Sequence, residues 1–246
     1  MPETIVLLHG FSGTRRAWDG VIEHLDPERY RPMALDLPGH GSAATYRPPI
    51  TFAGCVKHVL EQAPEHFALC GYSLGGRIAM HVALAAPERV TRLVIVSASP
   101  GVEEASERRA RRHADRRLAD ELERIPFDEF IERWRAQPLF AQDPPEVGEL
   151  ARADQRRNSP WALAEALRGL GVGEMGSLWG SLERLRMPTQ IVVGDRDRKF
   201  SEIAGRMSRL LPDCASRSVP GGHVLPLENP AAIADAIDRA PLEPLD

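Results

Sequence analysis

Ser73 is the residue of this chain whose setting most strongly indicates chemistry. It is the centre of Gly71-Tyr72-Ser73-Leu74-Gly75, a G-x-S-x-G pattern that follows the apolar run 67–70 and precedes a helical stretch over 76–86. A serine between a strand and a helix sits on a sharp turn with its hydroxyl above the sheet edge, and the flanking glycines let neighbouring backbone pass closely. The pattern alone also fits an ordinary turn with a capping serine, so the prediction of a reactive Ser73 depends on partners elsewhere.

An imidazole and a carboxylate would have to activate that serine. A hydroxyl becomes reactive when a histidine takes its proton, and the histidine needs an acid to hold its tautomer. With this type of serine turn the order along the chain is serine, acid, histidine. Seven of the eight histidines precede residue 197, and only His223 follows it, in the loop Pro220-Gly221-Gly222-His223. His223 is therefore the predicted base.

The acid is expected just after the strand that precedes the histidine loop. The apolar run Gln190–Val193 leads into Gly194-Asp195-Arg196-Asp197, which offers two carboxylates. We favour Asp197, because an extra turn past the strand end gives it the reach toward a histidine loop. Asp195 remains the alternative.

Two backbone N–H groups would have to stabilise an oxyanion beside Ser73. The residue after the serine, Leu74, supplies one of them. The other is expected at Phe11, in the loop that follows the first core strand in Ile5-Val6-Leu7-Leu8-His9-Gly10-Phe11. His9 precedes the serine in the chain, so we interpret it as a residue that braces this loop rather than as a base.

Arg77 lies four residues after Ser73 and therefore on the same face of the following helix. A partly buried guanidinium requires a counter-ion. The spacing leaves two sources open, a carboxylate of the protein or a carboxylate of the substrate. In the second case a bidentate pair would fix the pose of the substrate close to the reacting centre.

Length, charge and cysteine content restrict the class of protein. A chain of 246 residues is one domain's length for an α/β enzyme, and its net charge of −4 argues against nucleic acid as a partner. Cys55, Cys70 and Cys214 form no C-x-x-C motif and leave one thiol unpaired, as in a reducing compartment. No apolar run has the length of a membrane span, and the run 4–8 is too short for a signal peptide. We expect a cytoplasmic protein without membrane insertion.

Short apolar runs alternate with helical patterns along most of the chain. This alternation predicts a mostly parallel, doubly wound α/β sheet within one domain over residues 1–246. The short end Pro241–Asp246 belongs to no predicted element. The predicted strands are Thr4–Leu8, Arg31–Leu35, Phe67–Cys70, Leu93–Ser97, Gln190–Val193 and Ala215–Val219. The predicted helices are Arg16–Leu25, Thr51–Gln62, Gly76–Ala85, Ser201–Leu211 and Pro230–Arg239.

The alternation stops over residues 101–186. This segment contains only helical patterns, punctuated by Pro126, Pro138, Pro144, Pro145 and Pro160. An all-helical insertion before the acid-bearing strand is most simply a cap over the active site. The charged stretch 103–124 at its start is typical of a solvated helix face. One face of the cap must still look into the pocket, and an arginine there would attract anionic substrates.

Together these motifs resemble the α/β-hydrolase superfamily. His9-Gly10-Phe11, Asp36-Leu37-Pro38-Gly39-His40-Gly41, the serine turn and the acid loop all fit its pattern, so the resemblance covers nearly the whole chain. Within the superfamily the chain is similar to the 2-succinyl-6-hydroxy-2,4-cyclohexadiene-1-carboxylate synthases of menaquinone biosynthesis. The segments that carry this narrower resemblance are Arg77, Ala114-Asp115-Arg116, Trp134–Phe140 and Asp197-Arg198-Lys199-Phe200.

The narrower resemblance implies a lyase acting on a small polycarboxylate. Ser73, assisted by His223 and Asp197, would act as the base that starts the elimination of pyruvate. No metal and no organic cofactor is implied, and we find no cluster of metal ligands in the sequence.

The same resemblance implies which residues hold the substrate. Arg77 and Arg116 would bind its carboxylates, while Tyr72 and Trp134 would line the pocket. In the arginine-rich cap, the neighbouring residues Arg112 and Arg117 remain alternatives to Arg116.

Two other functions fit part of the pattern. A carboxylesterase, thioesterase or carbon–carbon bond hydrolase would use the same triad as a nucleophile and would not need Arg77. A non-catalytic protein could use the cap pocket as a receptor, although an intact triad in the expected order argues against it.

Overall fold

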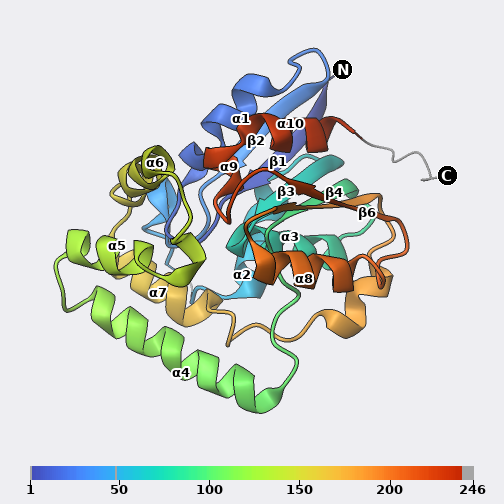
Figure 1. The fold of residues 1–246 in the computed structure, drawn as a ribbon. Helices are drawn as coiled ribbons and strands as arrows, with labels where there is room; N and C mark the ends of the chain where they lie inside the picture. Colours follow the sequence, from blue (N-terminus) through green and yellow to red (C-terminus); the bar gives the residue numbers. More distant parts are fainter. Residues whose placement is uncertain (1, 48, 240–246) are drawn as a thin grey trace.

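The computed structural model describes residues 2–47 and 49–239, and Figure 1 shows their fold. The predicted Pro241–Asp246 end lies outside the described residues. Six parallel strands form one sheet in the order β2-β1-β3-β4-β5-β6. They are β1 (Glu3–Leu8), β2 (Tyr30–Leu35), β3 (Phe67–Tyr72), β4 (Val90–Val96), β5 (Thr189–Gly194) and β6 (Cys214–Val219). Each predicted strand is present, which confirms the parallel α/β sheet.

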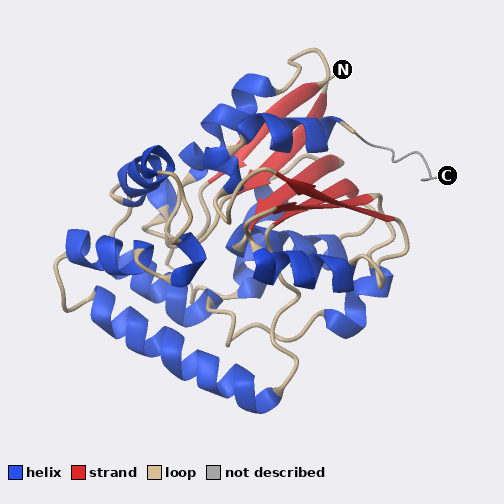
Figure 2. Cartoon of the chain, in the orientation of Figure 1, coloured by secondary structure: helices blue, strands red, loops and turns tan. Residues whose placement is uncertain are grey.

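Helices cover both faces of this sheet (Figure 2). Successive side chains of a strand point to opposite faces, and β1 follows this rule. Its Val6 and Leu8 join a core with α2 (Phe52–Gln62), α3 (Leu74–Ala85) and α8 (Arg198–Met207). Its Ile5 and Leu7 join a second core with α1 (Asp19–His24) and α10 (Pro230–Asp238). Burial on both sides is the reason why the central strands β1, β3, β4 and β5 are largely apolar in the sequence, and it confirms the doubly wound fold.

Some helices begin or end at other residues than the predicted ones. The helix expected over Arg16–Leu25 is a 3-10 turn, η1 (Arg15–Trp18), followed by α1. The helix expected from Ser201 begins earlier, at Arg198, because the Asp197 side chain caps it by accepting from the Phe200 N–H across 3.4 Å. A short helix after the histidine loop, α9 (Leu225–Glu228), was not expected.

The chain between β4 and β5, all of it described, contains only helices as regular elements. These are α4 (Ala105–Leu122), α5 (Phe127–Arg135), η3 (Pro138–Phe140), α6 (Pro145–Gln155), α7 (Pro160–Leu170) and η4 (Trp179–Arg184). In Figure 1, α4 to α7 gather on one side of the sheet. Ala119 and Leu122 of α4 pack with Leu163 and Leu167 of α7 in a separate small core. The inserted helices thus have apolar contacts of their own.

Across residues 2–47 and 49–239, no helix combines the length and the apolar character that a membrane span requires. Cys55, Cys70 and Cys214 are all free thiols. Burial raises the pKa of Cys55 to about 12, so this thiol is uncharged near neutral pH.

Candidate active site

Ser73 occupies the turn between β3 and α3. Its φ of 50° and ψ of −107° form a backbone conformation that is costly for a residue with a side chain. A Cβ atom on Gly71 would lie 2.3 Å from the Gly75 carbonyl oxygen, and one on Gly75 would lie 2.0 Å from that of Leu8. The close passage of the chain therefore requires both glycines of the motif. The strained turn is of the kind found where backbone geometry serves a site.

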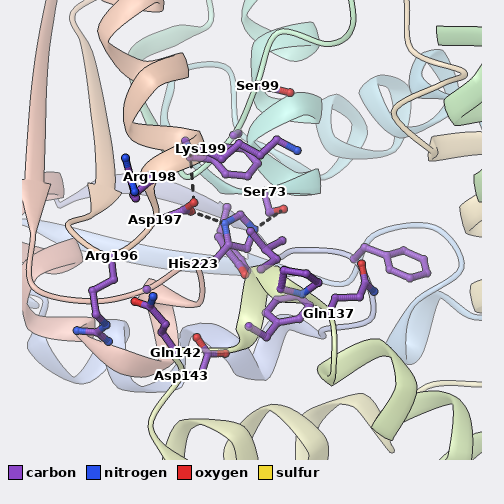
Figure 3. Close-up of a pocket in the computed structure, with 18 of the residues that line it drawn as sticks. Ser73, Ser99, Gln137, Gln142, Asp143, Arg196, Asp197, Arg198, Lys199 and His223 are labelled. Atoms are coloured by element: carbon purple, nitrogen blue, oxygen red, sulfur yellow. Dashed lines mark hydrogen bonds and ion pairs between the residues drawn. The ribbon is translucent and has the colours of Figure 1, made fainter. Parts of the chain in front are cut away.

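Ser73, His223 and Asp197 form one chain of hydrogen bonds (Figure 3). The Asp197 carboxylate is an acceptor, so Nδ1 of His223 carries the proton that it donates to Asp197 Oδ2 across 2.7 Å. This leaves Nε2 of His223 to accept from the Ser73 hydroxyl, 3.2 Å away. His223 and Asp197 are both buried. The arrangement has the order and tautomer that a serine needs to lose its proton.

The other carboxylate of the acid loop, Asp195, has a different place. Its Oδ1 accepts from the Gly221 N–H across 3.1 Å, and its side chain is exposed. Asp195 therefore holds the backbone of the histidine loop, whereas Asp197 contacts the imidazole itself.

The loop expected to supply an oxyanion contact lies beside Ser73. A Cβ atom on Gly10 would be 2.6 Å from the Tyr72 ring and 3.5 Å from Cβ of Ser73, so this backbone passes very near the serine. Phe11 lines the cavity in front of Ser73. Leu74 is the first residue of α3, where N–H groups have no acceptor inside the helix. Phe11 and Leu74 thus flank the serine from two different elements.

His9 braces this loop, as the sequence predicted. Its Nε2 accepts from the Leu37 N–H across 3.0 Å, and its Nδ1–H donates to the Gly10 carbonyl across 2.8 Å. The ring is completely buried, and burial lowers the pKa of His9 to about 4. It is therefore a neutral structural histidine near neutral pH.

Arg77 points into the cavity without an ionic partner in the protein. Its guanidinium donates to the Leu170 carbonyl across 2.9 Å and lies over the Phe52 ring. Within the described chain, no carboxylate is bonded to it, although the charge of Asp115 acts on it from a distance. Burial lowers the pKa of Arg77 to about 10, so it stays protonated at neutral pH. The described residues therefore supply no carboxylate bonded to this arginine as its counter-ion.

The cap arginine on the cavity wall is Arg111, which corrects the expectation for Arg116. Arg116 has a side chain that is 56% exposed and pairs with Glu174 across 3.1 Å, outside the cavity. Arg112 pairs with the same glutamate, and Arg117 does not line the cavity either.

The helical twist of α4 is the physical reason for this difference. Residues five positions apart point about 140° away from each other around a helix, so Arg111 and Arg116 cannot share a face. The inner face of α4 is marked by its buried residues Asp115, Ala119 and Leu122. Arg111, one turn before Asp115, bonds to it across 2.8 Å. This spacing of buried positions was the signal in the sequence that could have located the arginine.

Aromatic rings form much of the remaining wall. Trp134 packs edge-on against Phe11 with ring centres 5.1 Å apart and contacts Phe140 at 6.1 Å. The Tyr72 ring lies 5.4 Å from the His223 ring. Tyr72 and Trp134 therefore both line the cavity, as the resemblance implied.

The cavity in front of Ser73 has a volume of about 510 Å³ and a strongly cationic lining. Besides Arg77 and Arg111, its charged lining contains three cations from the acid loop and the start of α8, against the carboxylates of Asp143 and Asp197. These cations are Arg196, Arg198 and Lys199. Their contribution to the wall was not assigned from the sequence, although they follow the acid-bearing strand directly. Such a cavity suits a small molecule with several negative charges.

Metal ligands do not gather anywhere in the described part of the chain. No group of three or more histidine, cysteine, aspartate or glutamate side chains there could hold an ion.

Residues 5–236 match the model of the alpha/beta hydrolase family, and the chain belongs to this family. A curated relative from Enterobacter sp. (strain 638), 2-succinyl-6-hydroxy-2,4-cyclohexadiene-1-carboxylate synthase, is 34% identical over 94% of this chain and 88% of the relative. The solved structure of MenH from S. aureus is 30% identical, with a TM-score of 0.89, and covers 96% of this chain and 91% of that protein. These similarities confirm the resemblance drawn from the motifs.

The same fold also carries other activities. A thermophilic esterase from Thermogutta terrifontis is 24% identical with a TM-score of 0.82, covering 97% of this chain and 89% of the esterase. At this identity the likeness shows the fold alone. The choice of reaction therefore depends on the site.

Proposed function

We propose that this protein is a lyase of menaquinone biosynthesis. It would eliminate pyruvate from 2-succinyl-5-enolpyruvyl-6-hydroxy-3-cyclohexene-1-carboxylate to give 2-succinyl-6-hydroxy-2,4-cyclohexadiene-1-carboxylate. The observation that carries the proposal is the position of Arg77, an arginine with no carboxylate partner among the described residues, in the same cavity as the Ser73 hydroxyl. A hydrolase of simple esters has no use for such a charge, whereas a polycarboxylate needs it.

The triad supplies the base for this elimination. His223 takes the hydroxyl proton of Ser73, and Asp197 stabilises the imidazolium that results. The Ser73 oxygen then removes a proton from the substrate ring. The proton comes from ring carbon 2, and the electron pair of that C–H bond forms the C2–C3 double bond. The existing C3–C4 double bond moves to C4–C5 as the bond from C5 to the enolpyruvyl oxygen breaks. The departing enolate takes a proton from His223 and becomes pyruvate. Ser73 keeps the proton that it took from the substrate, so its hydroxyl is restored and the triad is back in its starting state.

The walls of the cavity hold the substrate during this step. Arg77 and Arg111 bind carboxylates on the cap side, and Tyr72 and Trp134 enclose the ring. The N–H groups of Phe11 and Leu74 stabilise the negative charge that develops near Ser73. Each role is supported by the position of the residue beside Ser73 or on the cavity wall.

Pyruvate release from the enolpyruvyl precursor tests the proposal. Its spontaneous breakdown is measured without protein and subtracted, and Ser73→Ala and Arg77→Ala are measured alongside. Turnover that is lost in Ser73→Ala and strongly weakened in Arg77→Ala supports the lyase. If pyruvate release stays at background while Ser73-dependent cleavage of simple esters or thioesters is rapid, the hydrolase alternative is correct.

A cytoplasmic location and a small-molecule partner belong to the same proposal. They are supported by the three free thiols, which suit a reducing compartment, and by the net charge of −4, which disfavours nucleic acid. Recovery of the pyruvate-releasing activity in the cytosolic fraction of the native cell would test the location.

A further inference from the structure

Asp197 and His223 stand on two different loops, one after β5 and one after β6, and a single carboxylate touches both loops. This carboxylate belongs to Glu228, the last residue of α9. Its Oε2 accepts from the N–H of Gly222, the residue before the base, across 2.6 Å. Its Oε1 pairs with the guanidinium of Arg196, the residue before the acid. Glu228 therefore connects the neighbours of both triad members.

The remaining contacts between the two loops fix the backbone one residue earlier. The Arg196 N–H donates to the Gly221 carbonyl across 3.0 Å, and the Gly221 N–H donates to Asp195 across 3.1 Å. The next N–H, that of Gly222, is held by Glu228. The peptide that leads directly into His223 is thus oriented by Glu228.

Both contacts of Glu228 are of the strong type. Its side chain is only 10% exposed, and each of its oxygens meets a different donor. Hydrogen bonds to a charged group that is largely shielded from water are stronger than those between neutral groups. Glu228 is also held in place by its own segment, because Asn229 donates to the Pro220 carbonyl across 2.9 Å and closes the loop.

The position of the imidazole tolerates little displacement. His223 must keep Nδ1 at 2.7 Å from Asp197 while Nε2 stays within 3.2 Å of Ser73. A shift of about 1 Å in a catalytic group can cost on the order of 100-fold in rate. Glu228 is not part of the cavity wall, so its effect would reach the reaction through the two loops and through its partner Arg196, which does line the cavity.

We propose that Glu228 is a positioning residue, whose charge ties the acid loop, through Arg196, to the base loop, through the Gly222 N–H, and so sets the distance between His223 and Ser73. This inference rests on the proposed function, because it concerns the same triad. It assigns a role to a residue that contacts neither the substrate nor the reacting atoms.

Steady-state kinetics of pyruvate release separate positioning from simple structural support. Glu228→Gln keeps an acceptor for the Gly222 N–H but loses the negative charge that pairs with Arg196. Its kcat should therefore fall about tenfold, the effect of one charge-assisted contact, while its KM changes less than about twofold. Glu228→Ala loses both contacts, so its kcat should fall by about 100-fold, as for a displaced catalytic group. The partial rescue by glutamine is the signature of positioning.

Two further variants control this experiment. Arg196→Met removes the other half of the ion pair, so its loss of kcat should not add to that of Glu228→Gln in the double variant. Glu103→Gln breaks an ion pair of similar type with Arg206, on the exposed surface, and should leave kcat unchanged. If Glu228→Ala does not fold, the pair of Arg196→Met and Glu228→Gln still tests the coupling.

The proposal is overturned if both Glu228 variants keep kcat within about twofold of the unmodified enzyme, or lose thermal stability with kcat unchanged. Labelling of Ser73 by a fluorophosphonate ester separates this result from failure of the proposed function. The probe reports an activated serine whatever the natural substrate is. Suppose that the unmodified protein releases no pyruvate but is labelled rapidly, and that Glu228→Gln and Glu228→Ala are labelled more slowly. This result would contradict the lyase function and would still support the positioning role of Glu228.

Discussion

The guanidinium of Arg77 donates to the main-chain carbonyl of Leu170 across 2.9 Å, so the nucleophile helix α3 is fastened to the end of cap helix α7. The Leu170 carbonyl accepts from one N–H group of the guanidinium but does not neutralise its positive charge. Burial lowers the pKa of Arg77 to about 10, yet the group remains cationic at neutral pH. A half-buried cation with no carboxylate bonded to it in the described chain is a costly feature, and it supports the proposal that an anionic substrate binds there.

Replacing this cation should weaken catalysis much more than folding. In Arg77→Met the apolar stem is retained and the charge is lost, so kcat/KM for pyruvate release should fall by about 10- to 150-fold, the equivalent of one or two charge-assisted hydrogen bonds. Arg77→Lys should recover only part of this, because an ammonium cannot bind a carboxylate through two parallel N–H groups. Urea unfolding of the same variants gives the control. A loss of stability that accounts for the lost activity would refute the substrate-binding role.

Arg111 and Arg116 form a matched pair for testing which cap arginine meets the substrate. Arg111 lines the cavity, whereas Arg116 pairs with Glu174 outside it. Arg111→Gln should raise KM by roughly three- to tenfold, because a partly exposed charge contributes about 1 kcal/mol. Glutamine keeps a polar contact for the buried Asp115. Arg116→Gln should leave KM unchanged, and equal effects of the two substitutions would contradict the assignment to Arg111.

The two aspartates of the acid loop should differ sharply when each is converted to its amide. Asp197→Asn would no longer fix the Nδ1–H tautomer of His223, so kcat should fall on the order of 10³- to 10⁴-fold, as in other serine triads. Asp195→Asn keeps an oxygen that can accept from the Gly221 N–H, so its kcat should stay within about threefold of the unmodified enzyme. A larger effect of Asp195→Asn than of Asp197→Asn would show that the geometric assignment of the acid is wrong.

Features set by local spacing could be predicted from the sequence, and those set by contacts between distant segments could not. The strand–helix alternation and the order of Ser73, the acid and His223 are properties of the chain itself. So is the placement of Arg77 one turn beyond Ser73. The choice between Asp195 and Asp197 was made on reach alone, but the structure distinguishes them by which donor each one meets.

The cap is where prediction from the sequence was weakest. Its helical character follows from the absence of strand patterns over 101–186, but the rotation of α4 about its axis depends on which residues it buries against α7. Choosing an arginine from the resemblance placed Arg116 in the pocket, whereas packing of Ala119 and Leu122 turns Arg111 toward it. The link from Glu228 to Arg196 was missed because nothing in the sequence relates a short helix after the histidine loop to the acid loop.

Two buried histidines should make the stability of the fold sensitive to mild acid. Burial lowers the pKa of His9 to about 4 and that of His40 to about 3, from an ordinary value of 6.5. The unfolded chain therefore binds protons below pH 6.5 that the folded chain does not bind. The contribution of the two histidines to the free energy of unfolding is fully present above pH 6.5. It falls as the pH drops from there toward 4, by roughly 1.4 kcal/mol per pH unit for each histidine.

Urea unfolding at pH 7, 6 and 5 would measure this slope above the range in which most carboxylates titrate. His40→Gln keeps a donor for the Pro38 carbonyl, which His40 contacts at 3.2 Å, and removes one proton-binding group. Its slope between pH 6 and 5 should be smaller than that of the unmodified protein by about one proton's contribution. His24→Gln, at an exposed histidine, should leave the slope unchanged. An unmodified protein whose stability is the same at pH 7 and pH 5 would show that these buried rings accept protons without loss of the fold.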